Sequence, residues 1–144
     1  MFEDIKAIQK TMASTAEFLK PLMASGEFNN NNDAFVLLKA TLKAIRDRVT
    51  PGESMHLAGQ LPALLRGFYF EGYDFSKTQA PVSQAKDVFD FLSDVRFHLG
   101  GHDYLNLEKT VPLAMRIIFD SIDQGEARQV KQQLPKEIQN FSMQ

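Results

Sequence analysis

The residues best suited to chemistry lie on one predicted helix in the second half of the chain. Asp90, Asp94 and His98 are spaced four residues apart, so a helix would place all three on one face. Carboxylate and imidazole groups bind divalent metals, and Asp87 could add a fourth ligand nearby. A solvated polar face opposite an apolar stripe produces the same pattern. We favour the solvated face and assign no metal to these residues.

The other histidines and the catalytic motifs give no stronger signal. His98 and His102 are separated by two glycines, so they lack the helical register of a His-x-x-x-His metal site. His56 lies early in a predicted helix and is expected at the surface. The sequence has no cysteine, no phosphate-binding glycine loop and no His-Glu-x-x-His motif. Catalytic groups can converge from distant positions, but we assign no catalytic residue, no metal and no cofactor, and we favour a protein that is not an enzyme.

The composition is that of a small protein with enough hydrophobic residues to form a core. The 144 residues are 44% hydrophobic and carry a net charge of −2, which gives no basic footprint for nucleic acid. The N-terminus, Met1-Phe2-Glu3-Asp4, is acidic and lacks the apolar core of a signal peptide. No apolar run is long enough to cross a bilayer. We therefore expect a cytoplasmic protein that contacts neither nucleic acid nor a membrane.

The elements that must position any site are repeated along the sequence. Residues 52–68 and 125–141 are related by an offset of 73, and six of their 17 paired positions are identical, where chance would give roughly one. Phe2 and Phe75 match at the same offset. We therefore predict an internal duplication that covers nearly the whole chain. The identical pairs include Gly52-Glu53 with Gly125-Glu126, Gln60-Leu61-Pro62 with Gln133-Leu134-Pro135, and Phe68 with Phe141.

Apolar spacing predicts the helices of the first half. Asp4 is a candidate N-cap for a helix that runs to about Pro21, which should kink or close it. The run Asn29–Asn32 is expected to form a polar loop, after which Asp33 would cap a second helix. The apolar stripe of that second helix leaves Arg46 largely outside it.

The next helix begins with a capping box. The Thr50 hydroxyl can accept from the Glu53 amide, while the Glu53 carboxylate can reach back to the Thr50 amide. Asp123 and Glu126 repeat the arrangement, so we interpret both glutamates as helix-start residues rather than catalytic ones. Proline disrupts a helix interior, so we expect a break before Pro62, with Pro62 as the first residue of a new helix.

The second half should repeat these elements. Ser83 is expected to open a helix that Gly100-Gly101 stops. The following helix should begin between Asn106 and Val111, and a break should follow at Gln133-Leu134.

Aromatic residues gather between the two copies, over residues 67–75. Neighbouring side chains in a helix or turn cannot all point inward, so this segment is either wrapped by the fold or partly turned to a partner. We favour wrapping, because a connection between two halves is a natural place for aromatic side chains. Phe97 points away from the apolar stripe of its helix and could mark an oligomer contact.

The motifs together resemble those of a bacterial family known as domain of unknown function 2267. The resemblance covers most of the chain and implies an all-helical cytosolic bacterial protein. It implies no activity, and no functional residue is carried over. The asparagine run is a departure that lengthens a loop. The matching residues are Ala44-Ile45-Arg46-Asp47-Arg48, Gly52-Glu53, Gln60-Leu61-Pro62, Leu64-Leu65-Arg66-Gly67, Tyr69-Phe70-Glu71-Gly72-Tyr73, Gly125-Glu126 and Gln133-Leu134-Pro135.

The residue patterns predict an all-α fold. We expect a single domain, residues 1–144, built as a tandem duplication of a roughly four-helix unit packed into one bundle-like domain. The two pseudo-repeats would span about 2–73 and 74–144. Because the repeated residues all have structural roles, the favoured function is a non-catalytic interaction or regulatory module with a protein partner or self-association.

The alternative is a small-molecule site at the seam between the repeats, because pseudo-symmetric halves create a crevice. Its polar anchors would be Gln60, Gln133, Tyr69 and Tyr73. The two glutamines could instead satisfy backbone groups at the helix breaks, which we favour. Helix-turn-helix DNA binding is the third hypothesis, and it is weak because Arg66 is the only basic residue near that turn.

Overall fold

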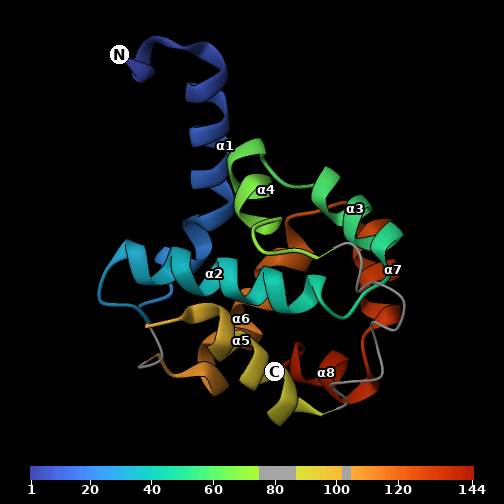
Figure 1. Cartoon of the computed structure of the whole chain (residues 1–144). Helices are drawn as coiled ribbons and strands as arrows, with labels where there is room; N and C mark the ends of the chain where they lie inside the picture. The colour runs from blue at the N-terminus through green and yellow to red at the C-terminus, as the bar shows by residue number, and fades with distance from the viewer. Residues whose placement is uncertain (75–86, 102–104) are drawn as a thin grey trace.

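The computed structural model describes residues 1–74, 87–101 and 105–144, and every regular element in these ranges is a helix (Figure 1). The prediction of an all-α fold is confirmed for this part of the chain. None of its helices is both long and apolar enough to cross a membrane. The helices are the 3₁₀ helix η1 (Phe2–Asp4), α1 (Lys6–Met23), α2 (Asn31–Arg46), α3 (Pro51–Gly59), α4 (Ala63–Tyr69), α5 (Val88–Leu99), α6 (Leu107–Asp120), α7 (Gln124–Gln133) and α8 (Lys136–Phe141).

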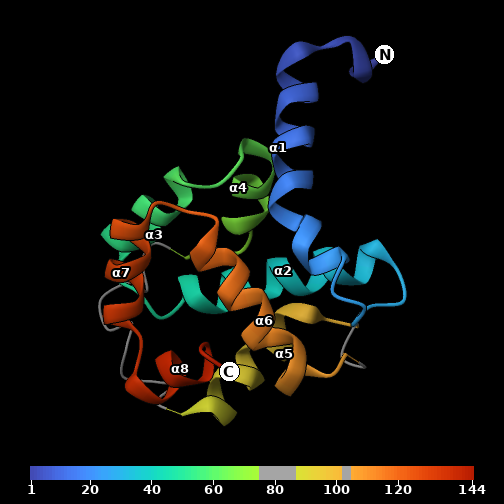
Figure 2. The same ribbon diagram turned by 180° about the vertical axis from the view of Figure 1, so that it is seen from behind.

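Helices from both halves of the sequence share one core. α2 crosses the centre of the molecule and packs against α5, α6, α1 and α4. α3 and α7 lie side by side at one end, and the N-terminal half of α1 projects from the body at another (Figures 1 and 2). The buried apolar side chains form one cluster that extends from Phe18 to Phe141. The apolar stripe predicted for α2 and the buried apolar side chains of α6 therefore face the same interior.

Two of the predicted helix starts are confirmed, and two others are wrong. The Thr50 hydroxyl accepts from the Glu53 amide at 3.3 Å, and the Asp123 carboxylate caps α7 in the same way. Asp4 does not cap α1, because it belongs to η1 and Ile5 precedes the first residue of α1.

The second wrong cap is in the asparagine run. Asn30, rather than Asp33, caps α2 by accepting from the Asp33 amide at 2.8 Å. The helix therefore starts inside the run that we predicted to be a loop. Asparagine is as good an N-cap as aspartate, so the residue type alone does not decide which of them starts the helix.

The two predicted helix breaks are confirmed, and their geometry is the same. α3 ends at Gly59 and α7 ends at Gln133. Pro62 has φ −55° and ψ 149°, and Pro135 has φ −54° and ψ 148°. Each proline is the N-cap of its helix, whereas we predicted that Pro62 would be the first helical residue. The extended ψ angle of each proline lies outside the helical region.

The later helices also begin and end near the predicted residues. Ser83 lies outside the described residues; α5 begins after Asp87, whose side chain accepts from the Asp90 amide at 2.8 Å. Gly100, with φ 61°, ends α5 in a conformation that favours glycine. α6 follows Asn106, within the predicted interval.

Arg46 is buried, which corrects the prediction that it falls largely outside the apolar stripe. Its side chain is 2% exposed. Its Nη1 atom donates at 2.8 Å to the carbonyl oxygens of Tyr69 and Glu71, and its Nε atom pairs with Asp47. The long side chain thus ties the end of α4 to α2. Burial of the arginine is tolerated because its Nε and Nη1 donors find a carboxylate and two carbonyl oxygens.

Candidate functional site

The junction of α3 and α7 joins the two halves by reciprocal hydrogen bonds. Gln60, after α3, accepts from the backbone amide of Asp123 at 3.0 Å. Gln133, at the end of α7, accepts from the backbone amide of Thr50 at 2.8 Å. Each glutamine therefore bonds the cap residue that starts the other helix. This is a backbone-satisfying role of the kind we favoured, although the partner lies in the opposite half.

Two glutamate side chains meet at this junction. Glu53 and Glu126 each occupy the third position of their helix, and each is 8% exposed. The Oε2 atom of each is buried and has no hydrogen-bond partner. Glu53 does not reach back to the Thr50 amide as the capping box predicted, because Gln133 takes that amide and donates its Nε2 atom to Glu53 Oε1 at 3.3 Å.

The electrostatics of the junction follow from the burial of two like charges. Burial, followed by the close approach of the Glu53 carboxylate and the charge of Asp123, raises the pKa of Glu126 to about 8. Two buried carboxylates this close repel each other when both are ionised, which favours a proton on one of them. The helix N-termini favour negative charge, but burial outweighs that effect for Glu126.

His56 completes a cluster of three metal-binding side chain types. It lies one turn after Glu53 on α3, and its Nδ1 atom is 4.0 Å from Glu53 Oε2. Glu53, His56 and Glu126 each place one ligand atom within 4.8 Å of the others. From the sequence, the two glutamates were expected to be helix-start residues and His56 a surface residue. The signal that could have found the glutamate pair is their matching position, because Glu53 and Glu126 are related by the offset of 73.

The predicted tyrosine anchors contact Ser54 and Arg46. Tyr69 is 1% exposed, and its hydroxyl bonds to the hydroxyl and carbonyl oxygens of Ser54 at 2.9 and 3.1 Å. Burial raises the pKa of Tyr69 above its ordinary value. Tyr73 lies beneath the guanidinium of Arg46, 5.2 Å from its ring centre. Tyr69 therefore joins α4 to α3. A ligand site formed by the two tyrosines and the two glutamines stays a prediction.

The aspartate and histidine side chains predicted to share one face of α5 bond residues just after the end of α2. Asp94 bonds Arg48, and His98 Nε2 lies 2.8 Å from Asp47 Oδ2. Burial opposes ionisation of Asp47, but hydrogen bonds from His98 and Arg46 outweigh it and lower its pKa. These groups pair α5 with the end of α2 and do not converge as metal ligands. His102 lies outside the described residues.

Phe97 is 79% exposed on α5, so it points away from the apolar stripe as the helical wheel predicted. Its ring lies edge-on to that of His98, with ring centres 5.2 Å apart. Its role as an oligomer contact stays a prediction.

The projecting half of α1 carries a second exposed apolar surface. No side chain before Thr15 is buried. Ile5 is 45% exposed and Met12 55%, and with the half-buried Ile8 they form a stripe along one face. We call these three residues the α1 stripe. At its base the Leu64 amide of α4 donates to the Thr11 hydroxyl at 2.8 Å.

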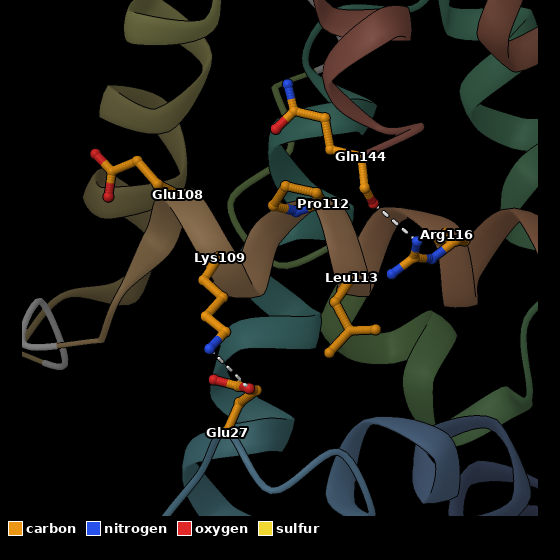
Figure 3. Close-up of a pocket in the computed structure, with 7 residues that line it drawn as sticks. All are labelled: Glu27, Glu108, Lys109, Pro112, Leu113, Arg116 and Gln144. Carbon is orange, nitrogen blue, oxygen red and sulfur yellow. Dashed lines mark hydrogen bonds and ion pairs between the residues drawn. The ribbon is translucent and has the colours of Figure 1, made fainter.

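Two shallow hollows lie away from the α3–α7 junction. One, of about 320 Å³, lies between α1 and α4 at the foot of the α1 stripe. The other, of about 360 Å³, lies along α6 (Figure 3). There Lys109 pairs with Glu27 at 3.4 Å, and Arg116 donates to the Gln144 carbonyl oxygen at 2.8 Å. Because Lys109 and Arg116 already have partners within the chain, we assign no ligand to the α6 hollow.

Comparison with known proteins gives a family and no activity. No curated protein matches the chain. A family model described as "Uncharacterized conserved protein (DUF2267)" matches residues 15–141. The matched region begins at the first buried residue of α1, so the α1 stripe lies outside it. Because the match covers most of the sequence, the chain belongs to the DUF2267 family of uncharacterized conserved proteins.

Proposed function

We propose that the chain is a non-catalytic interaction module whose α1 stripe binds a protein partner. The observation that carries the proposal is the exposed apolar face on a helix that leaves the body of the molecule (Figures 1 and 2). Of the nine exposed large hydrophobic side chains among the described residues, four lie within residues 1–12. Scattered exposed apolar residues are ordinary, whereas a grouped set marks a contact surface.

The spacing of the stripe suits a helix-in-groove contact. Residues 5, 8 and 12 follow the three- and four-residue intervals at which an amphipathic helix presents anchors to an apolar groove. Leu64, 40% exposed, extends the apolar surface at the foot of α1. Lys10 lines the adjoining hollow and could pair with an acidic residue at the rim of the partner's groove.

We also infer that the body of the module arose by tandem duplication. Adding 73 to the first residue of α3 and of α4 gives the first residue of α7 and of α8. The caps Thr50 and Asp123, the breaks at Pro62 and Pro135 and the reciprocal glutamine bonds support this inference. Duplication explains a scaffold in which each half completes the helix starts of the other.

Site-specific photo-crosslinking tests the interaction surface. A photoreactive amino acid replaces Met12, which is 55% exposed, in one variant and Met143, which is 76% exposed, in the matched control. We expect a discrete protein adduct in cells from position 12 and none from position 143. The adduct should disappear when Ile5→Lys is added, because a charge on the stripe cannot enter an apolar groove.

The alternatives have clear readouts. An adduct with the mass of two chains would identify self-association, which light scattering of the purified chain over a concentration series would then check. Absence of an adduct at position 12, together with a chain that stays monomeric, would overturn the proposal.

The predicted small-molecule alternative at the seam has one favourable observation, the buried carboxylate oxygens of Glu53 and Glu126.

A further inference from the structure

Glu53 and Glu126 present two buried oxygen atoms that lack a donor. Each Oε2 atom is buried, and the residues are 8% exposed. Among the described residues, no lysine or arginine forms an ion pair with either carboxylate. Buried carboxylates without donors are costly unless a proton or a cation neutralises them.

The geometry around these oxygens resembles an open ligand set. Glu53 and His56 come from the first turns of α3, and Glu126 comes from the first turn of α7. Their ligand atoms already lie within 4.8 Å of one another. The His56 side chain is 71% exposed, so solvent reaches one side of the cluster while the two carboxylates close the other.

We propose that Glu53, His56 and Glu126 bind one first-row divalent cation, of which Zn²⁺ is the representative probe. Zinc commonly takes imidazole nitrogen and carboxylate oxygen together, with water in a remaining position. Mg²⁺ and Ca²⁺ prefer ligand sets made only of oxygen, so a site with one histidine disfavours them. Small side-chain rotations would bring the three atoms to bonding distance.

The closeness of the two carboxylates favours a bound cation. Two carboxylates this near to each other repel when both are ionised, and a cation between them would remove that repulsion.

Binding at this place would link the two halves of the molecule. α3 and α7 come from different halves of the sequence and contact each other directly. A cation held by ligands from both helices would stabilise the folded chain by an amount that rises with the logarithm of its free concentration above the dissociation constant. This inference does not depend on the α1 stripe, which lies on a different helix.

The test measures zinc binding by the untagged full-length chain. Isothermal titration with ZnCl₂, after removal of metal with a chelator, should give one site per chain, and Zn²⁺ should raise the melting temperature. MgCl₂ at the same concentrations should do neither. His56→Ala should weaken zinc affinity by at least about 10–100-fold, because even changes behind the direct ligands cost that much.

Two further variants separate a zinc site from a general structural effect. Glu126→Gln should fold, since its amide can donate to Glu53, and should melt at or above the wild-type temperature without metal while losing the zinc response. A matched control, His98→Asn with His102→Asn, removes the other two histidines of the chain and should keep wild-type affinity.

Several outcomes would overturn the proposal. These are no zinc binding at micromolar concentration, equal affinity in His56→Ala, a retained zinc response in Glu126→Gln, or loss of affinity only in the control variant.

Discussion

Arg46 shows at the scale of one residue how α4 is fixed to α2. Its guanidinium is buried and donates to two carbonyl oxygens at the end of α4 and to the Asp47 carboxylate. Arg46→Ala would leave those carbonyl oxygens without their charged donor, so we expect the free energy of unfolding to fall by about 3–5 kcal/mol. Urea denaturation measures this loss.

The matched variant is Arg46→Lys. Lysine keeps the charge but lacks the planar fork that reaches all three acceptors, so its stability should lie between those of the wild type and Arg46→Ala. A loss of under about 0.5 kcal/mol in Arg46→Ala, the range of ordinary surface substitutions, would contradict this account of the contact.

Tyr69 gives a prediction about alkaline pH. Burial raises the pKa of its hydroxyl above the ordinary value of 10.0, so above pH 10 the unfolded chain loses this proton before the folded chain does. The contribution of the hydroxyl is therefore complete below that pH and declines as the pH rises. Tyr69→Phe should be less stable than the wild type by about 1 kcal/mol near neutral pH, and the gap should shrink at about pH 11.

Unfolding by urea at several pH values checks the trend for Tyr69. Tyr69→Phe keeps the ring and removes only the titrating hydroxyl. The difference in stability between the wild type and this variant at each pH therefore reports on the hydroxyl alone. A gap that stays constant, or widens, as the pH rises would show that the hydroxyl is not held in its neutral form.

At the scale of one helix, the ends were predictable from sequence where the signals are local. Thr50 and Asp123 cap their helices, and the Gln-Leu-Pro breaks occur where predicted. The predictions that Asp4 and Asp33 are N-caps were wrong, because other residues within a few positions can cap the same helices. The carboxylate pair of the candidate site could not be predicted from one helix, because each glutamate has a sufficient local role as a helix-start residue.

The two bridging glutamines yield a paired prediction for the helix starts. Gln60→Ala removes one acceptor from a partly exposed amide and should cost about 1 kcal/mol of unfolding free energy. Gln133→Ala should cost more, because it also removes the donor to Glu53, which is 8% exposed. Equal losses in the two variants would mean that the bond to Glu53 contributes nothing to stability.

At the scale of the whole molecule, the body and the projecting helix are separable in energy. Residues 1–14 contain no buried side chain, and the family match begins at residue 15. The Leu64 amide joins them to the body by donating to the Thr11 hydroxyl. Sequence periodicity predicted a helix here but could not tell which part of it the core covers, because the exposed and covered turns carry similar apolar spacing.

Truncation therefore has opposite consequences at the two ends. Removing residues 1–14 should lower the free energy of unfolding by only about 1 kcal/mol, the value of one hydrogen bond, while it abolishes crosslinking through the α1 stripe. Removing residues 131–144 deletes the same number of residues but takes away Ile138 and Phe141, which are 0% and 6% exposed. Each buried side chain contributes about 1.5–3 kcal/mol, so this variant should lose most of its stability. Thermal melting followed by circular dichroism distinguishes the cases, and a large loss on removing residues 1–14 would show that α1 belongs to the core along its whole length.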